Sequence, residues 1–524
     1  MFWADRIAKE IIDTRKPASG TSFLIRDEKT LSGRVHVGSM RGVAIHGLVG
    51  EVLSEQGVTN EYQYELNDFD PFDAIPHYLD ADVYTEHLGK PLYTVPSPND
   101  AFANYAEYFG AEYVAVHQKA GFTPTYYRAT ELYKSGKMDP YIKMSLDRAH
   151  DIRRILKEVS GSIKKDQWLP VSVVCEKCGK MMTTRSLSYD AEAEKVAYVC
   201  DISPDGTVPC GHEGSVSPYG GNTKLFWKTD WAAKWCAVGV DIEGAGKDHS
   251  TKGGSRDVAN AISREIFNRE PPYDIPYEFF LVGGKKMSSS KGSGSTAEEM
   301  SQLFPTTVFR LALIGKDINQ QIEVDPAGDS VPRMYDWHDE LALNVRNGIS
   351  DDFSRLYELT YPIEDRAGED APWMLRFSQV AFIAQMPHIH LLEEAESQKG
   401  GALTDEESAL LEERKQYALF WLHTYATDEH KFILQESVPA GLTLTSSQKA
   451  ALGLLSEYMS EQRSGEDIHA VLHGLKTEVP IPPKELFSAI YKVFLNRDSG
   501  PKAGWFLSVL PQEYVHKMLI QASQ

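Results

Sequence analysis

The chain has 524 residues, of which 42% are hydrophobic and 25% charged, and its formal net charge is −21. At about 150 residues per domain, this length predicts several domains and excludes a single small binding module. The composition is that of an ordinary globular protein, which excludes wholesale disorder and a fibrous repeat. No stretch approaches the roughly 20 consecutive apolar residues of a membrane helix, so we expect a soluble, cytoplasmic protein without a membrane partner.

The charge balance bears on nucleic-acid binding. Proteins that bind nucleic acid without sequence preference use Lys and Arg to replace phosphate counterions, and an acidic chain suits this mode poorly. About half of the net negative charge lies in residues 351–524. The composition therefore disfavours generic nucleic-acid binding and leaves room for a shape-specific RNA site on a local basic surface.

The first 60 residues predict a strand, a glycine-containing turn and a helix. Residues 21–26 are typical of a strand, and apolar residues recur at helical spacing from Val43 to Leu53. A second strand is expected at residues 61–65. This order is typical of the beginning of an α/β domain. Residues 97–165 then favour helices.

Further along the chain, residues 170–215 change to short hairpins with paired cysteines, and a second α/β stretch follows from about 225 to 300. From about residue 345 onward helices dominate. Thr404-x-x-Glu407 and Thr445-x-x-Gln448 are capping boxes, in which each side chain accepts a hydrogen bond from the other residue's backbone N–H at a helix start. The sequence thus predicts a multidomain α/β protein with an all-α carboxy-terminal region.

The first candidate site is His36-Val-Gly-Ser39, at the turn between the first strand and its helix. A helix N-terminus offers unpaired N–H groups and a partial positive charge, and an imidazole there can hydrogen-bond a phosphate. Gly38 would let a ligand approach the backbone. Taken alone, these four residues also fit a solvated loop histidine beside a glycine that starts a helix.

The second candidate site is the ten-residue stretch Gly283-Gly-Lys-Lys-Met-Ser-Ser-Ser-Lys-Gly292. Its lysines supply point charges and its serines supply hydroxyl donors, which suits a triphosphate whose negative charge grows on the leaving group. A flexible surface linker is the alternative. The position between an apolar strand and a helix favours the phosphate-binding interpretation.

Four of the five cysteines lie within 36 residues, which is typical of a metal site in a reducing compartment rather than of a disulfide framework. Cys175 and Cys178 form a tight knuckle between strand-like segments, as in a zinc ribbon. Tetrahedral zinc needs four ligands, and we expect Cys175, Cys178 and Cys200 with either Cys210 or His212. The alternative is that some of these cysteines are merely buried. Cys236 lies outside the cluster and is expected to be a core thiol.

These motifs resemble a known family. His36-Val-Gly-Ser39 is similar to the HIGH signature, and Lys286-Met-Ser-Ser-Ser290 to the KMSKS signature, of class I aminoacyl-tRNA synthetases. The flanking sequence resembles the class I lysyl-tRNA synthetases over nearly the whole chain, at Phe2-Trp-Ala-Asp5, Asp68-Phe-Asp-Pro71, Gly211-His-Glu-Gly214, Trp231-Ala-Ala-Lys-Trp235, Gly246–Ser255 and Gly500-Pro-Lys502. Where that family usually has a Gly/Thr-Pro-Ser-Gly pattern, this chain has Glu28-Lys-Thr-Leu-Ser-Gly33.

The resemblance implies a Rossmann-like catalytic domain with a zinc-binding insertion, followed by an α-helical anticodon-binding bundle. The expected segments are 1–165, the first half of the catalytic domain with a helical insertion; 166–222, a zinc-ribbon-like insertion; 223–300, the second half of the catalytic domain; 301–345, a connecting region that contacts the tRNA stem; and 346–524, the anticodon-binding domain.

The resemblance also implies a reaction, the ligation of L-lysine to tRNA(Lys) through a lysyl-adenylate, with ATP as substrate and Mg²⁺ and structural Zn²⁺ as cofactors. Activation of lysine is expected to require bound tRNA, and the enzyme is expected to be a monomer. Catalysis would then depend on positioning and charge stabilisation, because little proton chemistry is needed. His36, Gly38 and Ser39 are assigned to the nucleotide, and Lys286, Ser288 and Ser290 to the loop over the triphosphate.

For lysine recognition, the family pattern places Thr30 beside the substrate together with Trp227, His249 and Tyr277. An aliphatic stem that ends in an ammonium group suits an aromatic wall with hydrogen-bond acceptors. The alternative is that Trp227 and Tyr277 are core aromatics. The carboxylate partner of the ammonium stays open among Glu28, Asp68 and Asp70.

Two other functions share some of these features. A small-molecule nucleotidyltransferase has a similar turn and core, but such enzymes are usually a single domain, and the long helical region disfavours this interpretation. A catalytically inactive RNA-binding or regulatory paralogue is the other alternative, which the intact His36, Gly38 and Lys286 disfavour. ATP-dependent charging assays with twenty amino acids would separate the three.

Overall fold

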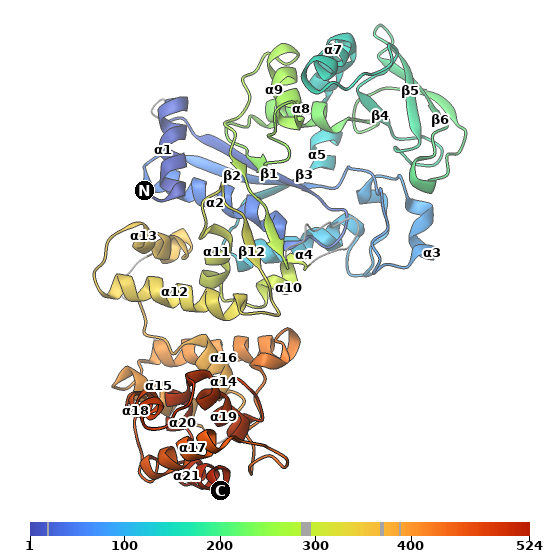
Figure 1. The fold of residues 1–524 in the computed structure, drawn as a ribbon. Helices are drawn as coiled ribbons and strands as arrows, with labels where there is room; N and C mark the ends of the chain where they lie inside the picture. The colour runs from blue at the N-terminus through green and yellow to red at the C-terminus, as the bar shows by residue number, and fades with distance from the viewer. Residues whose placement is uncertain (18–19, 284–294, 367–370, 387–388) are drawn as a thin grey trace. The chain divides into compact units, whose positions relative to one another are not determined.

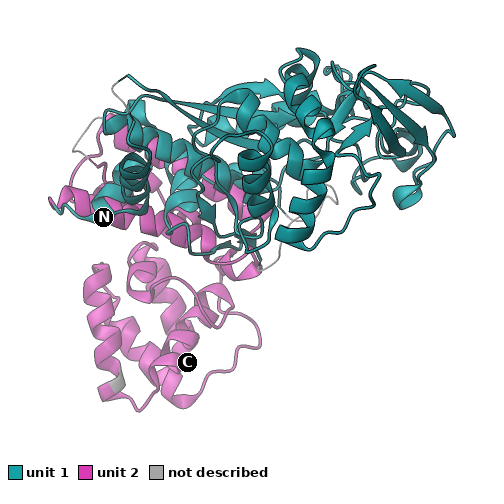
Figure 2. Ribbon diagram, turned by 90° about the horizontal axis from the view of Figure 1, so that it is seen from above, with its two compact units in different colours: residues 1–325, 349–368 teal, residues 326–348, 369–524 magenta. Residues whose placement is uncertain are grey.

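The structure is a computed structural model that describes residues 1–17, 20–283, 295–366, 371–386 and 389–524. It divides into two compact units, coloured separately in Figure 2. Unit 1 comprises Met1–Asp325 and Ile349–Gly368, and unit 2 comprises Pro326–Gly348 and Glu369–Gln524. The chain passes between the two units near residues 325, 348 and 368.

Unit 1 is built on a parallel sheet. Strands β1 (Phe23–Thr30), β2 (Asn60–Asn67) and β3 (Thr125–Arg128) pair in that order. Figure 1 shows the three strands together in the upper half of the view. β1 and β2 pair in register over their whole length. The two strands expected near residues 21–26 and 61–65 are therefore confirmed, and each extends two or more residues beyond its expected end.

The sheet continues on the other side of β1 through shorter pairings. Ile242 bridges to Ile25 of β1 and to Tyr273, both in parallel. The chain order across the sheet is then β3, β2, β1, the segment at Ile242 and the segment at Tyr273, which is the order of a doubly wound nucleotide-binding sheet. The winding direction reverses between β1 and Ile242. In such sheets ligands bind at the carboxyl ends of the strands beside this reversal.

Alternation along β1 gives its two faces different partners. Asp27 faces helix α2 (Met40–Glu55), where its Oδ2 lies 3.3 Å from His46 Nδ1. Glu28 faces helix α8 (Trp227–Val238), where its Oε2 accepts a hydrogen bond from Lys234 Nζ at 3.2 Å. β1 is thus enclosed on both faces, which is why buried polar side chains converge at its carboxyl end.

The remaining elements of unit 1 cover this sheet or extend from it. Two further parallel pairs join β9 to β10 and β11 to β12. The bounds are α1 Trp3–Arg15, α3 Ala81–Tyr84, α4 Tyr105–Lys119, α5 Ala129–Lys134, α6 Asp139–Asp147, α7 Ala149–Ser160, β9 Ala245–Gly246, α9 Ser255–Glu265, β10 Pro276–Tyr277, β11 Phe280–Val282, α10 Ala297–Ser301, α11 Thr306–Ile314, β12 Ile322–Val324 and α13 Asp352–Leu359.

The cysteine-containing segment forms short antiparallel strands, as expected from its hairpin-like sequence. β4 (Val171–Val173) pairs with β8 (Thr223–Leu225), so the chain leaves and returns at neighbouring positions. Between them, β5 (Thr184–Asp190), β6 (Lys195–Cys200) and β7 (Glu213–Val216) form a three-stranded sheet.

Unit 2 is helical, as expected for the carboxy-terminal region. Both capping boxes are present: Thr404 caps α16 with Glu407, and Thr445 caps α17 with Gln448. No helix in the described ranges of either unit is long and apolar enough to cross a membrane. The helices of unit 2 are α12 Ser330–Arg346, α14 Phe377–Ile383, α15 Leu391–Lys399, α16 Asp405–Thr424, α17 Ser446–Tyr458, α18 Gly465–Glu478, α19 Pro483–Leu495, α20 Ala503–Ser508 and α21 Gln512–Ser523.

Candidate functional site

A cavity of about 300 Å³ opens at the carboxyl end of β1, where the order of the sheet reverses. The end of β1, the turn before α2, the start of α8 and the segments after Ile242 and Tyr273 all contribute to it. Its lining residues are Asp27, Glu28, Lys29, His36, Gly38, Ser39, Tyr64, Trp227, Trp231, Glu243, Gly244, Ala245, Gly246, Asp248, His249, Tyr277, Phe279, Phe280 and Leu281. The cavity brings together six of the candidate residues: His36, Gly38, Ser39, Trp227, His249 and Tyr277.

The turn at His36 reaches α2 through a short 3₁₀ segment, Val37–Ser39. A Cβ on Gly38 would lie 3.0 Å from Nδ1 of His36 and 3.2 Å from the carbonyl oxygen of Phe280. A side chain at this position would therefore crowd both groups, and glycine keeps the backbone accessible from the cavity.

Lys286, Ser288 and Ser290 lie outside the described residues. The segments on both sides of them lie beside the turn at His36. Phe280 and Leu281 line the cavity, and the backbone N–H of Val37 donates a hydrogen bond to the carbonyl of Ser295 at 3.3 Å.

One half of the cavity has an aromatic wall. Trp227 stacks on Trp231 with ring centroids 5.7 Å apart and planes 14° from parallel, and His249 contacts Trp227 edge-on at 5.3 Å. Trp227 is 41% exposed, so it is not a core aromatic. Tyr277 lies beside Gly42 of α2, where a Cβ would come within 2.6 Å of its hydroxyl oxygen.

Thr30 does not line the cavity. Its hydroxyl donates a hydrogen bond to Asp70 Oδ2 at 2.5 Å, and Asp70 Oδ1 also pairs with Lys224 Nζ at 2.6 Å. The carboxylate of Asp68 accepts the backbone N–H of Thr130 at 2.9 Å. Of the three carboxylates considered for the lysine ammonium, Glu28 is the one that faces the cavity.

A buried ionic network lies beside the aromatic half. The guanidinium of Arg26 is fully buried and pairs with Glu28 at 2.6 Å, Glu65 at 2.7 Å and Glu243 at 2.7 Å. The indole N–H groups of Trp231 and Trp235 also donate to Glu243, each at 2.7 Å. These hydrogen bonds keep the buried charges paired, as burial requires.

Two lysines extend the network. Lys234 Nζ pairs with Glu65 at 2.5 Å and with Asp230 at 3.0 Å, and Lys224 bridges Asp230 and Asp70. Burial alone would lower the pKa of Lys234, but the surrounding carboxylates hold that pKa well above its ordinary value. The ion pairs centred on Arg26, Lys224 and Lys234 thus contain five carboxylates, so the network is rich in carboxylates.

Lys29, Trp231 and Glu243 are among the lining residues that sequence reasoning did not assign to the site. Trp231 follows Trp227 by four residues, so both lie on one face of α8, and helical spacing could have identified it. Lys29 lies between Glu28 and Thr30, the two neighbours that the sequence analysis considered for lysine recognition. Glu243 carries no local signal, because it reaches the cavity only through the order of the strands.

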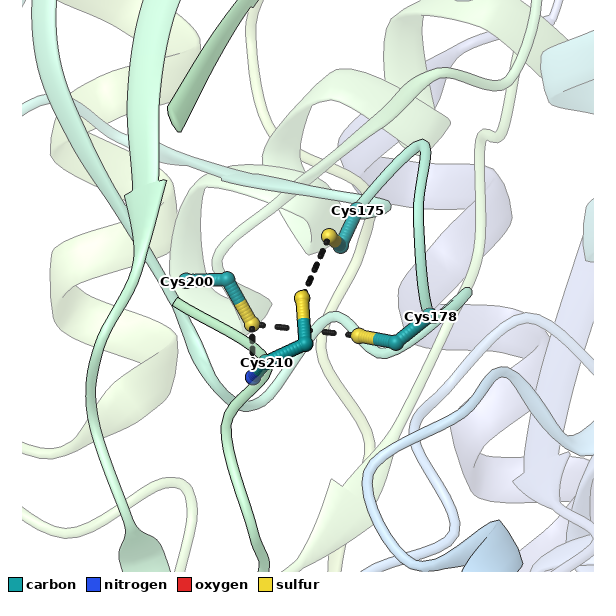
Figure 3. Close-up of side chains that lie close together, drawn as sticks. All are labelled: Cys175, Cys178, Cys200 and Cys210. Carbon is teal, nitrogen blue, oxygen red and sulfur yellow. Dashed lines mark hydrogen bonds between the residues drawn. The ribbon is translucent and has the colours of Figure 1, made fainter. Parts of the chain in front are cut away.

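The four clustered cysteines converge, as Figure 3 shows, and their Sγ atoms all lie within 4.8 Å of one another. Sγ of Cys175 is 3.6 Å from that of Cys210, and Sγ of Cys178 is 3.8 Å from that of Cys200. Four thiolates at about 2.3 Å from a tetrahedral zinc would be about 3.8 Å apart. The donor set and its spacing therefore fit zinc, with Cys210 rather than His212 completing the four.

The sequence matches the family described as tRNA synthetases class I (K) over residues 1–362. A lysine–tRNA ligase of Methanosarcina barkeri (strain Fusaro) is 34% identical, with 100% of this chain and 98% of the relative covered. Lysine–tRNA ligase 1 of Methanosarcina acetivorans is also 34% identical with the same coverage, and a lysine–tRNA ligase of Archaeoglobus fulgidus is 30% identical over 99% of both chains. The chain therefore belongs to the class I tRNA synthetases of the (K) family.

Proposed function

We propose that this protein ligates L-lysine to tRNA(Lys) using ATP, and that it does so as a cytoplasmic monomer. The observation that carries the proposal is the two-part cavity at the end of β1. One part is a helix-start turn suited to phosphate, and the other is an aromatic wall beside a network rich in carboxylates. The activity named for the relatives, lysine–tRNA ligation, agrees with this chemistry.

The aromatic half suits the side chain of lysine. Trp227, Trp231 and His249 offer apolar surface to its methylene stem and π-faces to its ammonium. Glu28 is the candidate carboxylate partner, since it lines the cavity and belongs to the acidic network. Tyr277 would close the side of the pocket opposite this aromatic wall. Because Thr30 is engaged with Asp70, its role would be to hold that carboxylate rather than to contact the substrate.

The first step joins lysine to AMP. A carboxylate oxygen of lysine bonds to the α-phosphorus of ATP, the bond from that phosphorus to the bridging oxygen breaks, and pyrophosphate leaves. His36, Gly38 and Ser39 would hold the nucleotide at the start of α2. Lys286, Ser288 and Ser290 are proposed to bind the triphosphate together with Mg²⁺, which arrives with ATP. The terminal adenosine of the tRNA then takes the lysyl group and AMP is released.

The cysteine cluster is proposed to hold a structural zinc ion. The strands around it are short, and sheets of this size rarely have a sufficient hydrophobic core of their own. Zinc would cross-link β6 to the knuckle at Cys175 and Cys178. This role is separate from the chemistry of the cavity.

Unit 2 is proposed to bind the anticodon. It contains a cavity of about 580 Å³ whose lining includes Phe432 and Trp505 together with Arg376 and Lys502. Aromatic faces beside cationic side chains suit an unstacked base and its phosphate. Such a local site is compatible with an acidic unit, because it relies on stacking and shape more than on total charge.

The test is aminoacylation by the purified protein, freed of nucleic acid, with each of twenty amino acids and with separate tRNA species. We expect charging with lysine on tRNA(Lys) alone, and we expect a lysine anticodon transplanted into another tRNA to improve its charging. Transfer of AMP to a small molecule without tRNA would indicate a nucleotidyltransferase instead. Binding of tRNA with no charging of any amino acid would indicate an inactive paralogue.

A further inference from the structure

Lys29 has an unusual position for a lysine. It lies one residue before the end of β1 and lines the cavity, where its side chain is half-buried. Within the described part of the chain, its ammonium group makes no hydrogen bond or ion pair, and its electrostatic partner is Asp27 of the same strand. Burial lowers the pKa of Lys29 below its ordinary value. Burial of a cationic group without a hydrogen-bonded or ion-paired counter-ion is unfavourable, and an anionic ligand in the cavity would supply such a partner.

The pleat of β1 determines which part of the cavity Lys29 faces. Side chains two residues apart share a face of a strand. Lys29 therefore lies on the face of Asp27, which contacts His46 of α2. Glu28 lies on the opposite face, where it contacts Lys234 of α8. Lys29 is thus on the side of the turn at His36, away from the aromatic wall proposed for the lysine side chain.

Few cations lie among the described residues of the phosphate half, which is the part of the cavity beside the turn at His36. Among the described lining residues, Lys29 is the one Lys or Arg, and the remaining candidate cations are the imidazoles of His36 and His249. A helix-start turn provides N–H donors and a partial charge only. The reacting phosphate would meet the lysine carboxylate at the boundary between the two halves, which is where β1 ends.

We propose that Lys29 contacts the α-phosphate of ATP and stabilises it while the lysine carboxylate attacks. This inference rests on the proposed function and assigns a further catalytic residue to it. In the step, the carboxylate oxygen–phosphorus bond forms, the bond to the pyrophosphate oxygen breaks, and no proton is transferred. The ammonium of Lys29 offsets negative charge that accumulates around the phosphorus, an effect that a preorganised cation exerts without reorganisation.

Kinetic variants test the catalytic role. Lys29→Met is expected to lower kcat/KM for ATP by about 10²-fold in ATP–pyrophosphate exchange with tRNA present, the scale of losing one preorganised charge-stabilising donor. KM for lysine should change less than threefold. Lys29→Arg should recover at least a tenth of the wild-type value. The control is Lys143→Met, since Lys143 is exposed on α6, pairs with Asp147 and lines no part of this cavity.

A labelling experiment tests contact with ATP independently of turnover. The wild-type protein is treated with pyridoxal 5′-phosphate, whose aldehyde condenses with an amine to an imine and water, and borohydride then reduces the imine to a stable amine. Peptide mapping should find Lys29 modified in the free protein and protected by ATP, but not by lysine. Equal labelling with and without ATP would overturn the contact.

The possible outcomes separate this inference from the proposed function. If Lys29→Met charges tRNA(Lys) at the wild-type rate, Lys29 is not catalytic and the ligase assignment stands. If Lys29→Met loses activity but Lys29→Arg and Lys29→Gln lose it equally with a lowered melting temperature, the role is structural and the proposal is wrong. If the wild-type protein charges no tRNA, the proposed function itself fails.

Discussion

At the residue scale, the most direct prediction for the cavity concerns His36. It stands immediately before the 3₁₀ segment that starts α2, and its ring lines the cavity next to Gly38. We predict that His36→Ala lowers the rate of lysylation by at least about 10²-fold, since it removes one preorganised donor to the phosphate. The measurement is initial-rate charging of tRNA(Lys), with thermal unfolding to show that the fold is retained. Turnover close to wild type in the folded variant would remove His36 from the site.

The candidate residues differ in how far the sequence could predict them. His36, Gly38 and Ser39 are consecutive or nearly so, and a strand–turn–helix pattern places them without knowledge of the rest of the chain. Lys29 and Glu243 come from different strands that are 214 residues apart in sequence, and no local pattern indicates that the sheet makes them neighbours. The sequence alone could not predict the part of the candidate site whose side chains are brought together by the order of the strands.

At the scale of elements, helix α4 packs on β2 and β3 through a histidine. His117 lies against Tyr64 with ring centroids 4.7 Å apart and against Tyr113 at 4.3 Å, and its Nδ1 is 3.0 Å from the hydroxyl of Tyr126. Burial lowers the pKa of His117 to about 3. The folded protein therefore keeps this imidazole neutral at any pH where the protein is handled.

This burial predicts a loss of stability in mild acid. The unfolded chain takes up a proton on His117 below about pH 6.5, whereas the folded protein does so only near pH 3, so acidification favours unfolding. The contribution lost at pH 5 is about 2 kcal/mol. His117→Phe should reduce the difference in unfolding free energy between pH 7 and pH 5 by about this amount, as measured by urea denaturation. Tyr126→Phe, which removes the hydrogen bond but no titrating group, should retain the wild-type pH dependence.

The cluster of Cys175, Cys178, Cys200 and Cys210 supports a prediction about metal content. We expect about one zinc per chain, and we expect Cys210→Ser to lose it, because three thiolates hold zinc less tightly than four. Elemental analysis and limited proteolysis of residues 166–222 are the readouts. Cys236→Ser is the matched control, since Cys236 lies on α8 outside the cluster and should leave the zinc in place. Zinc-free wild-type protein, prepared without chelators, would contradict the assignment.

Elements with local signals could be predicted from the sequence, and elements without them could not. The capping boxes at Thr404 and Thr445 each contain their own hydrogen-bond partners, and both helices begin where expected. The extension of the sheet beyond β1 depends on a single bridging residue, Ile242, which leaves too short a pattern for a strand. The composition of residues 349–368 does not predict their return to unit 1, because the ion pairs that hold them there join residues far apart in sequence.

At the scale of the whole molecule, the chain connects the two units in an unusual way. After helix α12 of unit 2, residues 349–368 return to unit 1 before the chain enters unit 2 again. Ion pairs connect this segment to α2: Arg355 pairs with Glu55 at 2.5 Å, and Arg366 pairs with both Glu51 and Glu55. Burial opposes ionisation of Glu55, but these arginines hold its pKa below the ordinary value.

The same helix carries the turn at His36 at its other end. A displacement of residues 349–368 would therefore shift α2. Because α2 is a rigid element, its shift would move the turn at His36 in the phosphate half of the cavity. The lysine half is assembled from segments near residues 227, 249 and 277, so a small shift between these and α2 would leave the pocket incomplete. The proposed binding of tRNA to unit 2 would be a source of such a displacement.

We therefore predict that lysine-dependent ATP–pyrophosphate exchange is weak without tRNA and rises steeply when tRNA(Lys) is added, an induced-fit arrangement. Exchange is measured in protein shown to be free of nucleic acid, with tRNA of another specificity as the control. Arg366→Ala should reduce the stimulation by tRNA more than it reduces tRNA affinity, because it releases α2 from the segment that links the units. Equal exchange with and without tRNA(Lys) would refute the coupling and would leave the ligase assignment standing, since activation and transfer are separate steps.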